Sequence, residues 1–249
     1  MSSVRDHYEE VLGAHYSPMF GDFEAKVAEQ RALLERLGVT GPAGTGLAVD
    51  LGCGSGFQSI GLARLGYRVL AIDFSERLLA ELRDRARGLP IEAIAGDIRD
   101  VARLVPSGVE LAVCMGDTLS HLEQEAEVER VLQDLAGRLA PGGRIMLTLR
   151  DLSGELHNLD RAIPVCARDD LVVTCFLEFE PTTVKVHDLV WSRQADGWHF
   201  AKGVYRKLRL SIDSAIRYLE RPGLTVERHP APGGLIALVG TRSGPGRTV

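Results

Sequence analysis

The chain has 249 residues, of which 45% are hydrophobic and 25% are charged, and its formal net charge is −5. This composition is ordinary for a globular protein and argues against a disordered or fibrous chain. The acidic balance argues against a protein that works on nucleic-acid phosphates or on an anionic membrane. No apolar run approaches the roughly 20 residues of a membrane span. We therefore expect a cytoplasmic protein with a small-molecule partner and with neither a nucleic-acid nor a membrane partner.

The four cysteines give no sign of a metal site. Cys53, Cys114, Cys166 and Cys175 show neither CxxC spacing nor a cluster with histidines. Zinc sites and disulfide frameworks both have recognisable cysteine spacings, and neither is indicated here. We interpret the four side chains as buried thiols and expect no bound metal.

Residues 1–40 are predicted to form a helical cap. Within them, the segment 21–38 places Phe23, Val27, Leu34 and Leu37 near one face of a helix that Gly38 ends. A Gly/Pro-rich link at residues 38–46 then leads into the next part of the chain.

Residues 46–150 alternate between strand patterns and helix patterns. Short apolar runs bounded by Gly or Asp predict strands at 46–52, 67–73, 91–97, 109–117 and 143–150. Helical stretches lie between most of them, at 57–66, 75–88 and 123–140. This alternation implies right-handed crossovers and predicts an α/β fold with a doubly wound, mostly parallel sheet. Ligands of such a sheet bind outside the carboxyl ends of its strands.

The alternation of strand and helix patterns ends at about residue 169. Long strand-forming runs at 170–180, 182–193 and 197–211 are separated only by short turns, which predicts antiparallel hairpins. A helical stretch at 212–220 and strands at 224–229 and 234–241 follow, and residues 242–249 are predicted to be a frayed tail. We therefore expect a core of residues 41–150 and 212–249, with an antiparallel β insert of residues 151–211.

A glycine-rich loop follows the first strand of the core. Residues 49–59 read VDLGCGSGFQS, so Gly52, Gly54 and Gly56 stand between a strand and a helix that begins near Phe57. Without Cβ atoms the backbone can lie against a ligand, and N–H groups at the helix start favour a pyrophosphate or a carboxylate. The spacing is GxGxG, whereas the dinucleotide fingerprint is GxGxxG, which argues against NAD.

Two acids close the next two strands. Asp73 ends the second strand, where a carboxylate can accept from both hydroxyls of a ribose; alternatively it caps the helix that begins at Ser75. Asp97 ends the third strand, where it can accept from the exocyclic amine of adenine while Ile98 packs on the ring. Helix capping is again the alternative for Asp97.

The runs VDLGCGSG, AIDFS, AGDI, VCMGDTLSHL and LAPGGRIML, between residues 47 and 150, together resemble the ordered motifs of a known family. The family is that of the class I S-adenosylmethionine-dependent methyltransferases, of the small-molecule N/O-methyltransferase type. The resemblance implies a seven-stranded sheet whose last strand is antiparallel, and S-adenosyl-L-methionine as the cofactor. The cofactor-binding residues that we derive from it, with one tyrosine of the N-terminal segment added, are Tyr16, Asp50, Gly52, Cys53, Gly54, Gly56, Asp73, Phe74, Asp97, Ile98, Met115 and Gly116.

The resemblance also implies which part of the cofactor each of these residues contacts. Asp50 and the glycine loop would hold its methionine part, Asp73 its ribose, and Asp97 with Ile98 its adenine. Met115 and Gly116 would line the sulfonium region. Asp117 follows at a position where many members of the family have asparagine, and it adds a negative charge near the sulfonium.

Methyl transfer from a sulfonium is an in-line displacement, so holding the two reactants in line in a dry pocket can supply much of the rate. A base is needed only when the nucleophile carries a proton of high pKa. Candidates are His121, just past the fourth strand, which can equally cap a local turn, and His187 and Tyr205 in the insert. Two-residue alternation places His187 and Trp191 on one side of a strand, which we expect to face the pocket.

Asp117 and Arg150 are the candidate substrate-binding residues. Arg150 ends the fifth strand, where its guanidinium matches the geometry of a substrate carboxylate or pairs with a neighbouring acid. The basic series Lys202, Arg206, Lys207 and Arg209 is typical of a solvated strand face.

We predict an enzyme that transfers the methyl group of S-adenosylmethionine to N or O of a small polar metabolite. This metabolite can carry a carboxylate. An S-adenosylmethionine-binding protein without catalysis and a nicotinamide-dependent oxidoreductase are the alternatives. The insert resembles the lid or dimerisation hairpins of small-molecule methyltransferases, and both a monomer and a homodimer fit the sequence.

Overall fold

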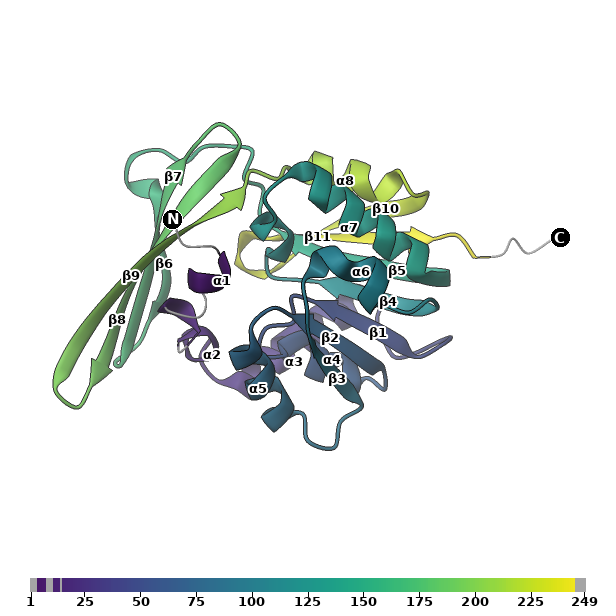
Figure 1. Ribbon diagram of the computed structural model, residues 1–249, viewed down its shortest axis with the longest axis horizontal. Helices are drawn as coiled ribbons and strands as arrows, with labels where there is room; N and C mark the ends of the chain where they lie inside the picture. Colours follow the sequence, from purple (N-terminus) through teal and green to yellow (C-terminus); the bar gives the residue numbers. More distant parts are fainter. Residues whose placement is uncertain (1–3, 8–10, 14, 245–249) are drawn as a thin grey trace.

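The computed structural model describes residues 4–7, 11–13 and 15–244, and it contains two separate β-sheets (Figure 1). The larger sheet has seven strands in the order β10-β11-β5-β4-β1-β2-β3. They are β1 (Leu47–Leu51), β2 (Arg68–Asp73), β3 (Ile91–Ala95), β4 (Val109–Cys114), β5 (Leu139–Leu149), β10 (Leu224–Pro230) and β11 (Ile236–Arg242). β1 to β5 run parallel, and β11 pairs antiparallel with both β5 and β10. The predicted seven-stranded sheet with an antiparallel last strand is confirmed.

Helices cover both faces of this sheet. On one face lie α3 (Phe23–Arg36), α4 (Phe57–Arg64) and α5 (Glu76–Arg85), and on the other lie α6 (Val101–Leu104), α7 (Glu125–Arg138) and α8 (Ile212–Glu220). Every residue of β1 is buried, as expected for a parallel strand with helices on both sides. The two helical layers therefore hold the carboxyl ends of the central strands in a fixed arrangement.

The smaller sheet is antiparallel and has the order β6-β7-β8-β9. Its strands are β6 (Ala162–Ala167), β7 (Leu171–Phe179), β8 (Thr183–Gln194) and β9 (Gly197–Leu208). The sequence predicted the last three but missed β6, which contains Pro164. Proline within an apolar run argues against a central strand, but β6 is an edge strand, where a missing N–H is tolerated.

The two faces of the smaller sheet differ, and β8 shows this most clearly. Every second residue from Val184 to Val190 is buried on the inner face, which is turned toward the core. His187 lies on the outer face, 3.0 Å from the Oε2 of Glu178, and Trp191 stacks there on Phe200. The prediction that His187 faces the pocket is therefore wrong. The alternation was read correctly, but the valines take the buried side because burying their apolar surface determines the register.

The N-terminal segment lies between the two sheets (Figure 1), with α1 (Val4–His7) against β9 and with α2 (Tyr16–Met19) beside it. The Nε2 of His7 lies 2.7 Å from the buried Oδ2 of Asp188 on β8. Gly203 of β9 pairs with Asp188, and a Cβ atom at Gly203 would lie only 2.3 Å from the ring of His7. The missing side chain at Gly203 therefore makes room for His7 and ties this segment to the smaller sheet.

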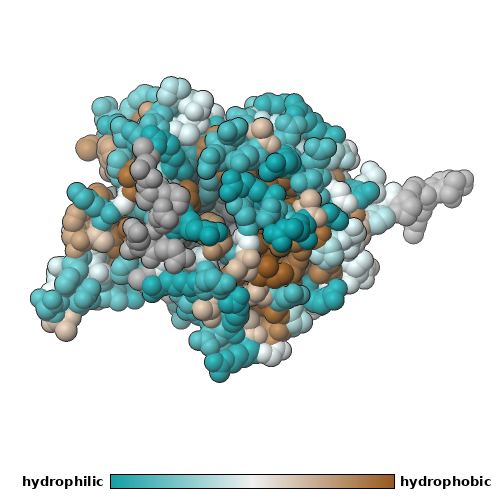
Figure 2. Space-filling model, viewed as in Figure 1, coloured by the Kyte–Doolittle hydropathy of each residue, from teal (hydrophilic) through white to brown (hydrophobic). Residues whose placement is uncertain are grey.

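Figure 2 shows hydrophilic residues over most of one side of the molecule, with hydrophobic residues also reaching the surface over the smaller sheet. Trp198 and Phe200 of β9 are 50% and 52% exposed. No helix within the described part of the chain is long and apolar enough to span a bilayer.

Candidate functional site

Two adjoining cavities lie between the larger sheet and the smaller one, at the carboxyl ends of β1 to β5. The first, called here the loop cavity, has a volume of about 620 Å³ and is lined by the glycine loop and by the ends of β2 and β3. The second, called the sheet cavity, has a volume of about 520 Å³ and is lined by the inner face of the smaller sheet and the loop before β11. The two cavities share Tyr16, Gly52, Gly116 and His121.

The glycine loop after β1 contributes to the loop cavity through Gly52 and Gly54. Gly54 has a φ of +53°, and a Cβ atom there would lie 3.2 Å from the ring of Tyr16, so the tyrosine ring lies directly against the bare backbone. Gly56 lines neither cavity. It has a φ of +95°, and it packs so closely on α5 that a Cβ atom there would lie 2.2 Å from a methyl group of Leu82. Gly56 thus serves the close packing of α5 on the loop.

Asp73 at the end of β2 connects this strand to the glycine loop. Its Oδ2 accepts a hydrogen bond from the N–H of Gly54 at 2.8 Å, and its Oδ1 accepts one from the N–H of Ser75 at 2.8 Å. The hydroxyl of Ser75, and not Asp73, caps α5. Burial raises the pKa of Asp73, although the two backbone hydrogen bonds oppose this shift. The carboxylate is therefore held at the wall of the loop cavity with lone pairs left for a ligand.

Asp97 and Ile98 line the loop cavity together with Phe74. Asp97 caps the 3₁₀ helix η2 (Ile98–Asp100) by accepting from the N–H of Arg99, and it also forms an ion pair of 2.6 Å with the Arg99 guanidinium. Burial alone would raise the pKa of Asp97, but the hydrogen bonds and charge of Arg99 outweigh it and lower the pKa. Asp97 therefore caps η2, as the alternative interpretation expected, and it also lines the loop cavity.

Asp50 lies beneath the glycine loop and lines neither cavity. It is 1% exposed, and its Oδ2 accepts a hydrogen bond from the hydroxyl of Ser59 at 2.6 Å. Burial raises its pKa to about 7, the bonds from Ser59 oppose this, and the charge of Asp73 adds to it. Cys53 is likewise buried and lines neither cavity. The structure thus does not bring these two predicted cofactor residues to a cavity wall.

The raised pKa of Asp50 makes stability depend on pH. Between about pH 4, the ordinary range for an aspartate, and pH 7, the folded chain holds a proton on Asp50 that the unfolded chain has lost. Raising the pH through this window therefore lowers the free energy of unfolding, and Asp50→Asn is expected to flatten that dependence. Denaturant unfolding across the window measures the slope. Asp84→Asn on the exposed face of α5 is the control, and an Asp50→Asn protein with the wild-type slope would contradict the prediction.

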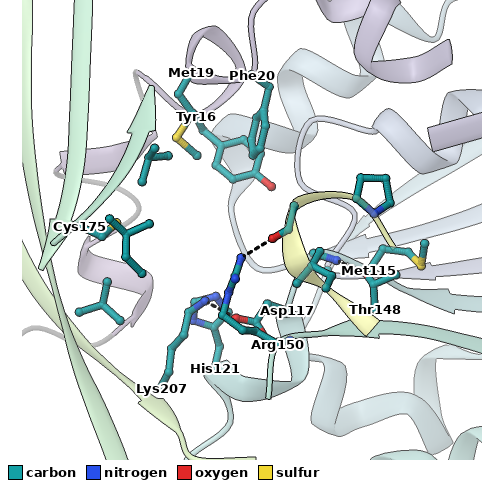
Figure 3. A pocket seen from close by; sticks show the side chains of 18 of the residues that line it. Tyr16, Met19, Phe20, Met115, Asp117, His121, Thr148, Arg150, Cys175 and Lys207 are labelled. Atoms are coloured by element: carbon teal, nitrogen blue, oxygen red, sulfur yellow. Dashed lines mark hydrogen bonds and ion pairs between the residues drawn. The ribbon is translucent and has the colours of Figure 1, made fainter. Parts of the chain in front are cut away.

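Asp117, Lys207 and Arg150 meet at the wall of the sheet cavity (Figure 3). The Oδ2 of Asp117 accepts from the Nζ of Lys207 at 2.7 Å, and its Oδ1 accepts from the backbone N–H of Arg150 at 3.1 Å. Burial would raise the pKa of Asp117, but the charge and hydrogen bond of Lys207 lower it on balance. The negative charge that aspartate brings to this position is therefore neutralised within the protein. Because its ammonium group pairs with the buried Asp117, the prediction that Lys207 lies on a solvated strand face is wrong.

His121 and Tyr205 are brought together at the junction of the cavities. His121 ends the 3₁₀ helix η3 (Thr118–His121) and lines both cavities, while Tyr205 of β9 lines the sheet cavity. Their ring centroids are 5.4 Å apart, and the ring of His7 also packs against Tyr205, with a centroid distance of 4.7 Å. Burial, together with the charge of Lys207, lowers the pKa of His121 to about 3. The imidazole is therefore neutral at physiological pH.

Met115, Gly116 and Arg150 are three further residues that the sequence analysis singled out, and Met115, predicted to contact the cofactor, does not line the loop cavity. Met115 and Arg150 line the sheet cavity, and Gly116 lines both cavities. The N–H of Gly116 donates to the hydroxyl of Thr148 on β5 at 2.7 Å, which fixes the turn after β4. The guanidinium of Arg150 donates to the carbonyl of Gly233 at 2.9 Å.

Sequence reasoning missed several further lining residues. Asp188 and Cys175 of the smaller sheet line the sheet cavity, and Thr118 and Arg5 line the loop cavity. Alternation along β7 and β8 could have selected the first two, had the buried side been known. Within residues 4–7, 11–13 and 15–244, no group of three or more His, Cys, Asp or Glu side chains is placed to hold a metal ion.

Comparison with known proteins shows which proteins this chain resembles. The methyltransferase domain family matches residues 48–143. The cypemycin N-terminal methyltransferase of Streptomyces sp is 33% identical over 103 residues, which are 41% of each chain. The glycine/sarcosine N-methyltransferase of Halorhodospira halochloris is 29% identical over 115 residues, which are 45% of this chain and 43% of that one. The chain thus matches less than half of the length of these two relatives.

Solved structures resemble the chain over nearly its whole length. The amino pentose methyltransferase CalS10 of Micromonospora echinaspora, in a structure with bound S-adenosylmethionine, has a TM-score of 0.76 and 18% identity, over 94% of this chain and 97% of that one. An S-adenosylmethionine-dependent methyltransferase of Clostridium acetobutylicum has a TM-score of 0.72 and 15% identity, over 95% and 96%. At these identities the likeness is one of fold, and it includes the smaller sheet.

Proposed function

We propose that this chain is an S-adenosylmethionine-dependent methyltransferase that transfers a methyl group to N or O of a small molecule that bears a carboxylate, and the match of residues 48–143 to the methyltransferase domain family supports this. The observation that supports this most is the pair of cavities sharing Tyr16, Gly52, Gly116 and His121. A donor in the loop cavity and an acceptor in the sheet cavity would meet at these four residues.

The residues of the loop cavity suit S-adenosylmethionine. Asp73 presents a fixed carboxylate to the ribose hydroxyls, and Phe74 with Ile98 offers apolar contacts to adenine. The missing side chain at Gly54 makes room for the ring of Tyr16, which closes that side of the loop cavity. When bound, the cofactor supplies a methyl group made electrophilic by its sulfonium.

The residues around the junction orient the acceptor and exclude water. His121 is neutral, so its imidazole can accept a hydrogen bond from an N–H or O–H of the acceptor without adding a positive charge beside the sulfonium. Its low pKa makes it a positioning group and not a strong base. Tyr205 packs against it from the smaller sheet and limits its movement. Alignment in this enclosed junction then supplies much of the rate.

Arg150 is the residue that we propose to bind the acceptor carboxylate. Arg150→Ala is expected to raise KM for a carboxylate-bearing acceptor by about 10- to 100-fold, as expected for the loss of a hydrogen bond to a charged group, and to leave cofactor affinity nearly unchanged. Its backbone bond to Asp117 survives the change. Steady-state kinetics and cofactor titration measure the two quantities.

Arg36 offers a matched control for Arg150. Its guanidinium donates to the carbonyl of Pro230, the last residue of β10. The loop that follows Pro230 contains Gly233, to which Arg150 donates. Arg36 itself does not line the sheet cavity. Arg36→Ala is expected to leave KM unchanged. An Arg150→Ala enzyme with an unchanged KM would remove the carboxylate clamp from the account.

A further inference from the structure

The inner face of the smaller sheet forms one wall of the sheet cavity, and this wall is largely aliphatic. Its residues come from the four adjacent strands of this sheet, and its aliphatic residues come from β6, β7 and β8. The aliphatic members are Ile163, Val165, Val173, Leu177, Val184 and Val186. A ligand that lies on this wall therefore meets methyl groups over much of its surface.

The charged groups on the same wall are already paired within the protein. Asp188 accepts from the thiol of Cys175 at 2.8 Å and pairs with His7 at 2.7 Å. Lys207 is bound to Asp117 at 2.7 Å. A ligand that competed for these groups would leave a buried charge without its partner, which is costly. The wall therefore selects for apolar surface.

Arg150 differs from these groups. Among the described residues its guanidinium donates to the Gly233 carbonyl and forms no ion pair, so it keeps further N–H donors. The sheet cavity of about 520 Å³ also falls within the range of roughly 300–1,000 Å³ that is usual for drug-sized ligands, so it is far larger than glycine requires.

We propose that the methyl acceptor is amphipathic, with a ring-sized apolar body on the aliphatic wall and an anionic group bound by Arg150. This inference rests on the proposed function and narrows the predicted small polar metabolite to a class with apolar bulk. Glycine-like acceptors, which lack that bulk, leave the aliphatic wall uncovered and are disfavoured.

A pair of fluorescent probes tests both parts of the proposal. 1-Anilinonaphthalene-8-sulfonate has an apolar two-ring-system body and an anion, and N-phenyl-1-naphthylamine has the same body without the anion. Each is titrated into the full chain saturated with S-adenosylhomocysteine, so that the loop cavity is filled. We expect saturable binding of both probes with one site each. Arg150→Ala should weaken the sulfonate probe at least tenfold and leave the neutral probe nearly unchanged.

Two matched variants locate the probe. Val165→Glu places a charge on the cavity wall at a residue that is 40% exposed, so folding is not threatened, and it should weaken both probes at least tenfold. Val172→Glu makes the same change on the outer face of β7, opposite Trp191, and should have no effect. Weakening by Val172→Glu in place of Val165→Glu, or no saturable binding, would overturn the apolar wall as a ligand surface. Equal loss of both probes in Arg150→Ala, or no loss, would overturn the anion site.

The failure of this inference can be told apart from failure of the proposed function. If S-adenosylhomocysteine does not bind, the cofactor assignment fails. If it binds and the probes behave otherwise than expected, only the acceptor class fails.

Discussion

Replacing Asp117 with alanine is expected to lower the free energy of unfolding by about 3–5 kcal/mol, the usual cost of breaking a buried ion pair by removing one partner. Asp117 is 6% exposed and holds Lys207 of the smaller sheet and the backbone of Arg150 together. Alanine would leave the ammonium group without its counter-charge. It would also occupy a position with a φ of +74°, which aspartate and asparagine tolerate better.

Chemical denaturation of a mutant cycle measures this effect. Lys207→Met combined with Asp117→Asn should recover much of the loss, because no buried charge is then left unpaired. Asp170→Ala, which removes the surface pair with Arg168, is the control and should cost less than about 1 kcal/mol. If Asp117→Ala unfolds at the wild-type denaturant concentration, the pair does not join the smaller sheet to the core as described.

Replacing Asp73 with alanine is expected to weaken S-adenosylmethionine binding by about 100-fold. A hydrogen bond to a charged group contributes about 1.5–3 kcal/mol, so the loss of the ribose contacts accounts for a change of this size. The substitution also frees the N–H of Gly54 and so loosens the glycine loop at the cavity wall. Both effects act on the same ligand and in the same direction.

Isothermal titration of the variant checks this prediction, with Asp100→Ala as the control. Asp100 ends η2 near the same edge of the sheet, but it pairs with Arg103 and does not line the loop cavity. The control should bind as tightly as wild type. An Asp73→Ala protein with wild-type affinity would mean that Asp73 only holds the glycine loop against β2 and does not bind the cofactor.

The core of the fold could be predicted from the sequence because its signals are local. Strand and helix patterns alternate along residues 47–149, and Gly52, Gly54 and Asp73 stand where a strand gives way to a helix. Positions at the carboxyl ends of parallel strands meet at one edge whatever the details of packing. That rule is enough to place most of the loop cavity.

The rest depends on pairing between distant segments, which local patterns do not encode. Asp117 and Lys207 are 90 residues apart in sequence, and nothing near either one indicates the other. Alternation identified the two faces of β8 but not which face is buried, so His187 was assigned to the wrong side. The burial of Asp50 against Ser59 likewise depends on how α4 packs beneath the loop.

The measurement that tests the central claim most directly is isothermal titration of the purified chain with S-adenosylmethionine, S-adenosylhomocysteine and NADH in parallel. The arrangement of Gly54, Asp73 and Ile98 around the loop cavity predicts micromolar binding of the first two and none of NADH. Binding of NADH alone, or binding of none of the three, would contradict the assignment of the loop cavity to S-adenosylmethionine.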